Sequence, residues 1–597
     1  MRALVTFPLT RESERILLTE HVLYRPGLAE EPLPVGAPDA ELPDVVLAHH
    51  GQSRLIALSA RAWPSVPVVV CGLSRTEFPD DLPRHAGGCF AVSARSWALA
   101  EYEAFIVAEG LCRPKPAPLP IRPGSPRDAV LVGAGVVNLV TALALLDRGW
   151  SVEVFDRHAD PTVHCDQPSA RRGATFGGKD ARIFSFNESR HHLAKSPAIA
   201  PNGVAQFRRS IGSDGWLSVA AERMGEADRA WIRQFESVPP WAAMAYGNDI
   251  IRFNIESHNA WRKMFGLHPE LLQGTGYVGR LLRIYQTDES FRAAIRSEAE
   301  LGALIEVLEL ERLAADEPAL AGAIRDGAIA GALKVQGFSL GIQSFARNLV
   351  RLLASTGVTF HWNHELEAIS RGGNGSVTGV TINGTFRTAS SYVVSPGAYG
   401  TEIRGADRAL GQIGAMVGMW ITIPNDIDPL SSPLKVRRRG FGSTEAAEGA
   451  NIIPGVDDAG CPVLHCSSGH GFLGVHPRNI DLANLPELAR CVRETVRDLF
   501  GDKLAKAKQS DVSGEAPEFC IRPWTPSGLG IFDFHPTRDG GALVVSGGHN
   551  TGGFAQSPAV ADAVVSTLEG RSHPMQTLYH PERYRAVFAA AAQETPS

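Results

Sequence analysis

The chain has 597 residues, enough for roughly three to four domains of ordinary size. Its 58 basic and 64 acidic residues give a formal net charge of −6 and no excess of Lys and Arg for nucleic acid, while 44% hydrophobic and 20% charged residues exclude disorder on a large scale. The apolar runs are too short to cross a bilayer, no signal-peptide pattern opens the chain, and the eight cysteines form no framework of close pairs, so we expect a cytoplasmic protein without a transmembrane segment.

Residues 1–112 have the pattern of a small α/β domain. Short segments rich in Val and Leu alternate with helical patterns, which is typical of a parallel sheet. This segment contains no glycine-rich phosphate turn. Six prolines then crowd the linker 113–127, where they favour an extended path. We therefore expect residues 1–112 to be an accessory domain, separated by the linker from everything that follows.

A dinucleotide-binding pattern follows the linker directly. A buried strand runs into Gly133 and Gly135, a helical pattern follows, and a second strand ends at Asp156. The first glycine allows a tight turn, and the second lets the backbone approach a pyrophosphate at the helix N-terminus. Asp156 follows Gly133 by 23 residues, where a carboxylate can bind ribose hydroxyls. Asn138 stands where the motif usually has its third glycine, so this position departs from the pattern.

The segment from Ala129 to Arg157 resembles the FAD-binding start of the D-amino acid oxidase superfamily, which includes glycine oxidases, sarcosine oxidases and D-amino acid dehydrogenases. Later segments support the resemblance in the expected order: 174–183, 316–366, 392–399, 520–529 and 547–553. The resemblance covers about residues 128–590 and implies a fold of mixed α/β and α+β type. Its Rossmann-like FAD-binding domain takes about 128–220, 335–410 and 515–590, and its antiparallel-sheet substrate domain takes about 221–334 and 411–514, within a catalytic region 128–597.

The resemblance also implies the residues of the FAD site. These are Gly133, Gly135, Asn138, Asp156, Arg157, Thr175, Gly177, Gly178, Leu366, Gly397, Ala398, Cys520, Gly548, Asn550, Thr551, Gly552 and Gly553. The last glycines precede an apolar helix, whose dipole can stabilise negative charge on the reduced flavin. Cys520 falls where monomeric sarcosine oxidases tether FAD covalently, whereas the Arg-Pro that follows is similar to glycine oxidases. Covalent attachment through Cys520 and a buried, unreactive thiol therefore both stay open.

Two arginines are the candidates for catalysis. A guanidinium binds a carboxylate through two charge-assisted hydrogen bonds. In glycine oxidases and D-amino acid oxidases the Arg of the corresponding Arg-Pro turn holds the substrate carboxylate, which implies this role for Arg522. Arg182 either lies near the flavin, as in sarcosine oxidases, or is an ion-paired structural arginine. We identify no general base.

No metal site is expected. The nearest group of possible ligands is Cys461, His465, Cys466 and His470, which lacks the Cys-x-x-Cys pair that is usual in zinc sites.

The resemblance implies an FAD-dependent oxidation of the C–N bond of an amino acid or N-substituted amino acid. A hydride would pass from the substrate Cα to flavin N5, the imine would hydrolyse in water, and O2 or another acceptor would reoxidise the flavin. Two alternatives stay open: a flavin-dependent 2-hydroxyacid oxidase or hydroxylase, and a flavin sensor without catalysis. The pattern fixes neither the amine nor the electron acceptor.

Overall fold

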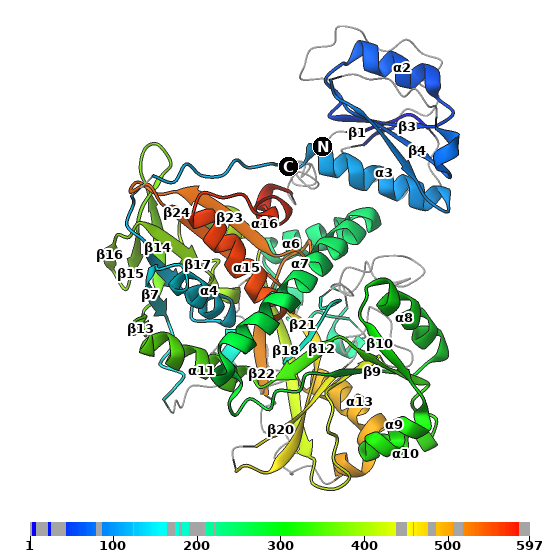
Figure 1. The fold of residues 1–597 in the computed structure, drawn as a ribbon, viewed down its shortest axis with the longest axis vertical. Helices are drawn as coiled ribbons and strands as arrows, with labels where there is room; N and C mark the ends of the chain where they lie inside the picture. Colours follow the sequence, from blue (N-terminus) through cyan, green and yellow to red (C-terminus); the bar gives the residue numbers. More distant parts are fainter. Residues whose placement is uncertain are drawn as a thin grey trace. The chain divides into compact units, whose positions relative to one another are not determined.

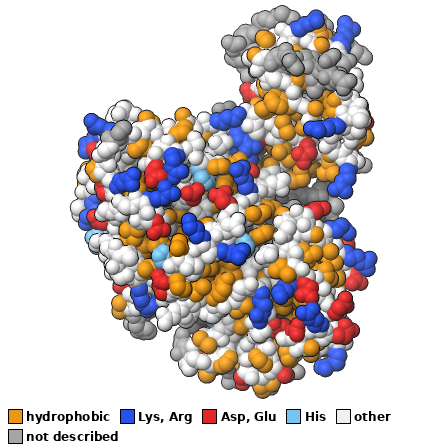
Figure 2. All heavy atoms as spheres, in the orientation of Figure 1, with side chains coloured by type: hydrophobic (Ala, Val, Ile, Leu, Met, Phe, Trp, Pro, Cys, Tyr) orange, Lys and Arg blue, Asp and Glu red, His pale blue; other side chains and the backbone are white. Residues whose placement is uncertain are grey.

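The computed structural model (Figure 1) forms two compact units, which we describe separately. Unit 1 contains Met1–Pro116, Ser237–Tyr246 and His580–Ser597, and unit 2 contains Ala117–Glu236 and Gly247–Tyr579. The described residues are 3–7, 22–24, 43–78, 86–122, 124–163, 173–177, 182–189, 207, 209–213, 215–219, 221–437, 450–457, 459–475, 485–505 and 518–583. None of the described helices is long and apolar enough to cross a bilayer. Acidic and basic side chains both occur across the face shown in Figure 2.

Unit 1 is built on a five-stranded parallel sheet with the order β2-β1-β3-β4-β5. Its elements are β1 (Ala3–Val5), β2 (Val22–Tyr24), β3 (Val45–His49), α2 (Ser53–Ala62), β4 (Val68–Gly72), β5 (Cys89–Ser93) and α3 (Trp97–Cys112). The β-branched side chains Val46 and Val68 of two central strands pack with Leu55 of α2 in one apolar core. The α/β architecture predicted for the first part of the chain is thereby confirmed.

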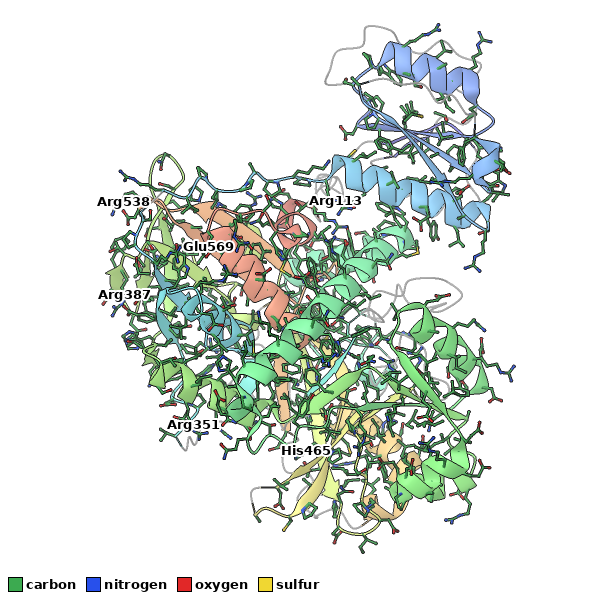
Figure 3. All side chains as sticks on the ribbon, viewed as in Figure 1. Arg113, Arg351, Arg387, His465, Arg538 and Glu569 are labelled. Carbon is green, nitrogen blue, oxygen red and sulfur yellow. The ribbon has the colours of Figure 1, made fainter. Side chains whose placement is uncertain are left out.

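Two segments distant in sequence complete unit 1. Trp241 stacks on Phe105 of α3, with 5.6 Å between the ring centroids. Arg583 is fully buried, and its Nε donates a hydrogen bond to Glu109 Oε1 at 2.8 Å. Arg113, at the end of α3 in Figure 3, donates from Nη2 to the other oxygen of Glu109 at 2.6 Å. A buried ion pair thus joins α3 to the C-terminal part of the chain.

Unit 2 contains a six-stranded sheet with the order β13-β7-β6-β17-β24-β23, in which only β23 runs antiparallel to its neighbour. The strands are β6 (Asp128–Val132), β7 (Ser151–Asp156), β13 (Thr359–Trp362), β17 (Ser391–Val394), β23 (Ile531–Pro536) and β24 (Ala542–Gly547). Helices α4 (Val136–Leu146) and α15 (Gly553–Leu568) pack side by side (Figure 1). Val130 and Val132 of β6 share a core with a three-stranded sheet of β14 (Leu366–Arg371), β15 (Val377–Ile382) and β16 (Thr385–Arg387).

The second large sheet of unit 2 has eight strands in the order β10-β11-β9-β19-β20-β21-β18-β22. They are β9 (Leu281–Tyr285), β10 (Leu304–Leu308), β11 (Gly331–Val335), β18 (Gly414–Pro424), β19 (Leu434–Arg437), β20 (Ala450–Val456), β21 (Pro462–Gly474) and β22 (Glu518–Trp524). Its pairs are antiparallel except β9 with β19. The long helix α13 (Leu485–Ala505) packs on β18 and β21.

The two-sheet architecture predicted for the catalytic region is therefore confirmed. The edge strand β22 carries Cys520 and Arg522 into the eight-stranded sheet, although its residues lie in a segment assigned from sequence to FAD binding.

The remaining helices connect the sheets. The described ones are α5 (Gly173–Phe176), α6 (Glu226–Ser237), α7 (Pro240–Leu267), α8 (Asp288–Glu300), α9 (Leu310–Asp316), α10 (Ala321–Arg325), α11 (Ile342–Ser355), α12 (Asp407–Leu410) and α16 (Pro574–Leu578). A two-stranded sheet of β8 (Arg182–Ser185) and β12 (Gly337–Leu340) completes unit 2. Helix α7 begins within unit 1 and continues into unit 2.

Candidate FAD and substrate site

The glycine turn after β6 lies at the switch point of the six-stranded sheet, where the chain continues to β7 on one side and β17 lies on the other. Gly133 has φ +96°, and a Cβ there would lie 2.4 Å from the carbonyl oxygen of Ser395, so the fold itself requires this glycine. Gly135 caps α4 without a side-chain hydrogen bond, and among the described residues a Cβ there would meet only Thr175 Oγ1, at 3.5 Å. The protein's own packing thus leaves the space at Gly135 open.

Buried polar atoms without partners border this turn. Asn138 donates from Nδ2 to the carbonyl oxygens of Val132 and Gly133 at 2.8 and 2.9 Å, so it fastens the turn in place of the usual third glycine. Among the described residues, neither Asn138 Oδ1 nor Ser395 Oγ has a hydrogen-bond partner. Such atoms are costly unless a ligand or water meets them. Ser395 was not predicted; its one signal is that it directly follows a buried strand, β17.

The residues predicted for the adenosine half gather beyond β7. Asp156 accepts hydrogen bonds from the backbone N–H of Ala134 at 2.7 Å and of His158 at 2.8 Å, which leaves further lone pairs on its carboxylate for ribose hydroxyls. The guanidinium of Arg157 lies 3.8 Å from the ring centroid of Tyr399. Its Nη1 lies 3.6 Å from Glu365 Oε1.

The neighbouring predicted residues lie in the same part of the sheet. Leu366 is buried at the start of β14, and the backbone N–H of His364 donates to the carbonyl oxygen of Asp156 at 2.8 Å. Gly397, at φ +64°, begins the short 3-10 helix η12 (Gly397–Tyr399), in which Ala398 is buried. The structure therefore brings together the groups that the sequence pattern assigned to one end of the dinucleotide.

A second helix begins with glycines at α15. Gly552 caps the helix without a side-chain hydrogen bond, and Gly548 has φ +65°. Asn550 accepts from Thr525 N–H at 3.1 Å and donates to Gly528 O at 2.8 Å, so its side chain fixes the turn. Thr551 Oγ1 lies 2.9 Å from Ser189 Oγ. With α4 beside it, α15 supplies a second N-terminal dipole and a second set of backbone donors for an anion.

His549 lies inside this turn and was not predicted as a site residue. Burial lowers the pKa of its imidazole to about 4, so the ring is neutral at physiological pH. Its Nε2 lies 3.1 Å from Ser546 Oγ. A Cβ on Gly530 would lie 2.2 Å from His549 Nδ1, which shows how closely the backbone encloses the ring.

The loop before β8 reaches the start of α4. Thr175 Oγ1 accepts a hydrogen bond from the Val136 N–H at 3.0 Å, and Gly177 N–H donates to Gly173 O at 2.8 Å. Arg182 donates from Nη2 to the carbonyl oxygen of Ala174, so it braces this loop. Gly178, also predicted to contact FAD, lies outside the described residues.

Cys520 and Arg522 project from the same face of β22. Cys520 is fully buried in an apolar cluster that includes Ile183 and Trp420. The half-buried Arg522 guanidinium lies 5.5 Å from the Trp420 ring centroid. Burial lowers the pKa of Arg522; the charge of Arg182 acts in the same direction, while interactions with Cys520 and Glu188 oppose it. Arginine nevertheless stays protonated in proteins.

A second arginine on the same sheet differs from Arg522 in its ion pairing. Arg283 of β9 has Nη1 3.4 Å from Glu298 Oε1 and also donates to Asn187. Burial lowers the pKa of Arg283, but Glu298, Tyr285 and Glu188 raise it, and the net shift is upward. Arg522 has no such ion pair with any carboxylate in the described parts of the chain. Among the residues that the structure describes, Arg283 is paired with a carboxylate and Arg522 is not.

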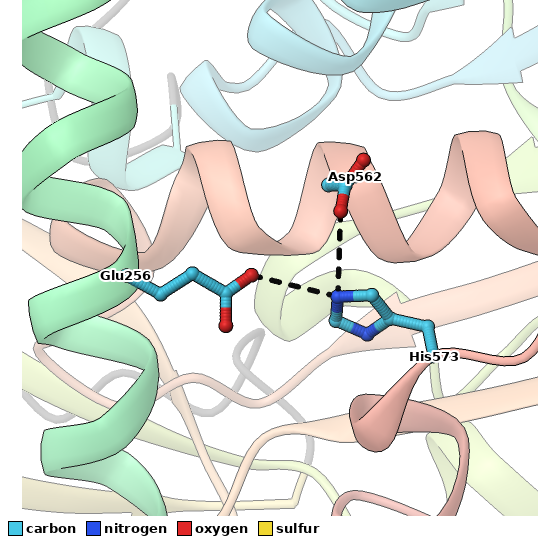
Figure 4. Close-up of side chains that lie close together, drawn as sticks. All are labelled: Glu256, Asp562 and His573. Atoms are coloured by element: carbon cyan, nitrogen blue, oxygen red, sulfur yellow. Dashed lines mark ion pairs between the residues drawn. The ribbon is translucent and has the colours of Figure 1, made fainter.

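Three possible metal ligands converge in unit 2, namely Glu256, Asp562 and His573 (Figure 4). His573 Nε2 lies 3.5 Å from Glu256 Oε1 and 3.6 Å from Asp562 Oδ2. However, His573 Nδ1 accepts the Met575 N–H at 3.1 Å as the cap of α16, which places the ring proton on Nε2. In this tautomer the Nε2 proton faces the two carboxylates, and Nε2 has no lone pair for a metal. We interpret this group as a structural link between α7, α15 and α16.

A parallel sheet with a glycine turn at its switch point and a second glycine-capped helix beside it defines a dinucleotide-binding protein. The profile of the FAD dependent oxidoreductase (DAO) family matches residues 128–567, and the chain belongs to this family. The predicted resemblance is confirmed, and with it FAD as the cofactor. The glycine cradles and the unpartnered Asn138 and Ser395 atoms fit such a group.

Several solved structures are similar to this chain at low sequence identity. Glycine oxidase from Geobacillus kaustophilus is 18% identical, with 75% of this chain and 95% of that chain covered and a TM-score of 0.46. L-proline dehydrogenase from P. horikoshii is 14% identical, with 77% and 98% covered and a TM-score of 0.49. Fructosyl peptide oxidase from E. terrenum is 12% identical, with 77% and 92% covered and a TM-score of 0.50.

Proposed function

We propose that this enzyme oxidises the C–N bond of an amino acid or N-substituted amino acid whose carboxylate binds Arg522. The observation that carries the proposal is that Arg522 forms no ion pair with any carboxylate among the described residues. Burial penalises the charge of the half-buried Arg522 guanidinium, and such partly desolvated charges concentrate at functional sites, where a ligand supplies the opposite charge. Arg283, on the same sheet, has the carboxylate partner that Arg522 lacks among the described residues, namely Glu298.

In this proposal, separate groups of residues bind the two ends of FAD. Gly133, Gly135, Asn138 and the α15 turn with Gly552 and Gly553 hold the FAD pyrophosphate and flavin. Asp156, Arg157, Leu366, Gly397 and Ala398 hold the adenosine. When bound, FAD would serve as the acceptor of a hydride from the substrate α-carbon, while these residues would orient both partners and exclude water. Attachment of the flavin through Cys520 stays a prediction, and the buried, apolar surroundings of the thiol favour its alternative, a packing role.

Arg522 orients the substrate through its planar fork. Two parallel N–H donors fix both carboxylate oxygens and therefore the direction in which the α-carbon points. Trp420 beside the guanidinium is apolar on its face, which strengthens the ionic contact by excluding water. No described side chain is needed as a base if the amine binds in its neutral form.

The test is Arg522→Lys, which keeps the charge but loses the fork. Losing one bidentate contact costs about 2 to 4 kcal/mol, so kcat/KM for the preferred amino acid should fall roughly 30- to 1000-fold. Anaerobic flavin reduction is compared for that acid and for the same amine lacking the carboxylate. We expect the acid preference of the wild type to be largely lost, with the flavin content unchanged.

A conservative control is Arg351→Lys, at the exposed Arg351 of α11 (Figure 3), which should leave both rates unchanged. If Arg522→Lys slows both compounds equally, or releases the flavin, the carboxylate assignment is wrong. If 2-hydroxyacids rather than amino acids reduce the wild-type flavin, the enzyme is instead a 2-hydroxyacid oxidase.

A further inference from the structure

The Arg522 guanidinium lies over a position that has no side chain. In the antiparallel pair of β18 and β22, Arg522 is opposite Met416 and Cys520 is opposite Gly418. The Arg522 side chain therefore leans diagonally along the sheet toward Gly418, the reach that long side chains have across a strand pair. A Cβ at Gly418 would lie 2.2 Å from both Cζ and Nη2 of Arg522, and 2.7 Å from Nε. The guanidinium occupies the volume that any other residue would fill.

The backbone gives no reason for a glycine here. Gly418 is absent from the residues with positive φ, so its conformation is open to ordinary L-residues. The β18–β21 register does shift between Val417 and Met419, which makes a bulge a competing explanation for the glycine. On the β22 side, however, the ladder continues through Gly418 without a shift.

The slot over Gly418 has defined walls. Trp420 follows Gly418 on the same face of β18, with its ring centroid 5.5 Å from Arg522 Cζ. Cys520 interacts with the guanidinium from β22, and Arg182 acts on it with a like charge. A long, flexible side chain has many rotamers, and only a shaped surface selects one of them. The bare backbone of Gly418 provides that surface.

We propose that Gly418 is a positioning residue: the absence of its side chain forms the slot that aims the Arg522 guanidinium at the substrate carboxylate. This inference rests on the proposed function for the carboxylate, but the slot itself does not. The proposal predicts that adding a single methyl group at position 418 lowers the activity in the same way as displacing the Arg522 guanidinium would.

The experiment is a double-mutant cycle on the purified, FAD-loaded enzyme, with wild type, Gly418→Ala, Arg522→Ala and the double variant. The first measurement is kcat/KM for the preferred amino acid and for its amine without the carboxylate. Because a displacement of about 1 Å can cost on the order of 100-fold, Gly418→Ala should lower the rate with the acid by roughly that factor. The rate with the amine should change less than about threefold, and in the Arg522→Ala background Gly418→Ala should have no further effect on either.

The second measurement is the thermal midpoint of the same four proteins, which needs no substrate. Gly418→Ala should lower the midpoint more when Arg522 is present than when it is absent, and the difference should be small because the guanidinium is the end of a flexible side chain that can move aside. If Gly418→Ala alone fails to fold while the double variant folds, that result also supports a clash between the added methyl group and Arg522. The control Gly501→Ala, on α13 with open space around its Cβ, should change neither rate nor midpoint.

The outcomes separate the two hypotheses. Equal effects of Gly418→Ala in both backgrounds, or failure of both proteins to fold, would show that β18 needs the glycine for its bulge, and would overturn the inference. A coupled thermal midpoint together with an unchanged acid preference in Arg522→Ala would leave the slot intact and refute the carboxylate assignment instead.

Discussion

Removing the carboxylate of Glu109 should destabilise unit 1 strongly. Glu109 is buried in α3 and is held by two arginines: fully buried Arg583, at 2.8 and 3.3 Å, and Arg113 at 2.6 Å. Glu109→Ala removes the carboxylate that Arg583 contacts on α3, so the buried guanidinium loses that counter-charge. Breaking one side of a buried ion pair costs about 3 to 5 kcal/mol, because desolvation of the remaining charge is no longer offset.

The Glu569→Ala variant is a matched control for this measurement. Glu569 (Figure 3) also contacts two arginines, Arg571 at 2.7 Å and Arg148 at 3.5 Å, but both arginines are about half exposed. Exposed ion pairs are worth about 0 to 1 kcal/mol. Equilibrium urea unfolding should therefore show a much larger loss of stability for Glu109→Ala. Equal losses below about 1 kcal/mol in both variants would refute the argument that burial makes the Glu109 pair structurally necessary.

Two further predictions follow from the FAD-binding side. Gly135→Val should keep the thermal midpoint of the FAD-free protein near that of wild type but abolish flavin uptake, and full flavin absorbance in this variant would contradict the prediction. Gly133→Ala should instead destabilise the FAD-free protein itself, because its Cβ would lie 2.4 Å from a carbonyl oxygen. Burial lowers the pKa of His549 from 6.5 to about 4, so the folded state binds fewer protons than the unfolded state in this range and stability falls as the pH drops from about 6.5 to about 4. His549→Asn should remove about 1.4 kcal/mol per pH unit of that slope, measured as the difference in unfolding free energy from wild type, and parallel pH profiles of the two proteins would argue against a buried neutral ring.

The glycine turn could be predicted because all of its determinants are local. A strand, two glycines, a helix and a terminal acid occur within 29 residues, from Asp128 to Asp156, and each constrains the backbone of its immediate neighbours. The role of Asn138 could not be predicted from the same motif. It depends on the carbonyl oxygens of Val132 and Gly133 turning toward its amide, which only the folded turn shows.

Sheet membership was harder to infer than the presence of strands. The segment containing Cys520 and Arg522 pairs with β18, about 100 residues earlier in the chain, so no local pattern indicates its partner or its register. The register of this strand also decides the position of Arg522 in the site. A shift of one residue would turn Arg522 to the other face of the sheet, away from Gly418 and Trp420.

The linker illustrates how a correct local observation can leave the organisation of a chain open. Its described residues form no helix or strand, and proline-rich segments are typical of domain boundaries. Yet the compact unit that contains residues 1–116 also includes Ser237–Tyr246 and the segment that begins at His580. Trp241 and Arg583 would lose their partners on α3 if the first 116 residues were removed. We therefore expect that a chain starting near Arg122 exposes the Trp241 ring and removes the Glu109 contact of buried Arg583. The first part of the protein should then be needed for stability, although no FAD-binding residue is assigned to it.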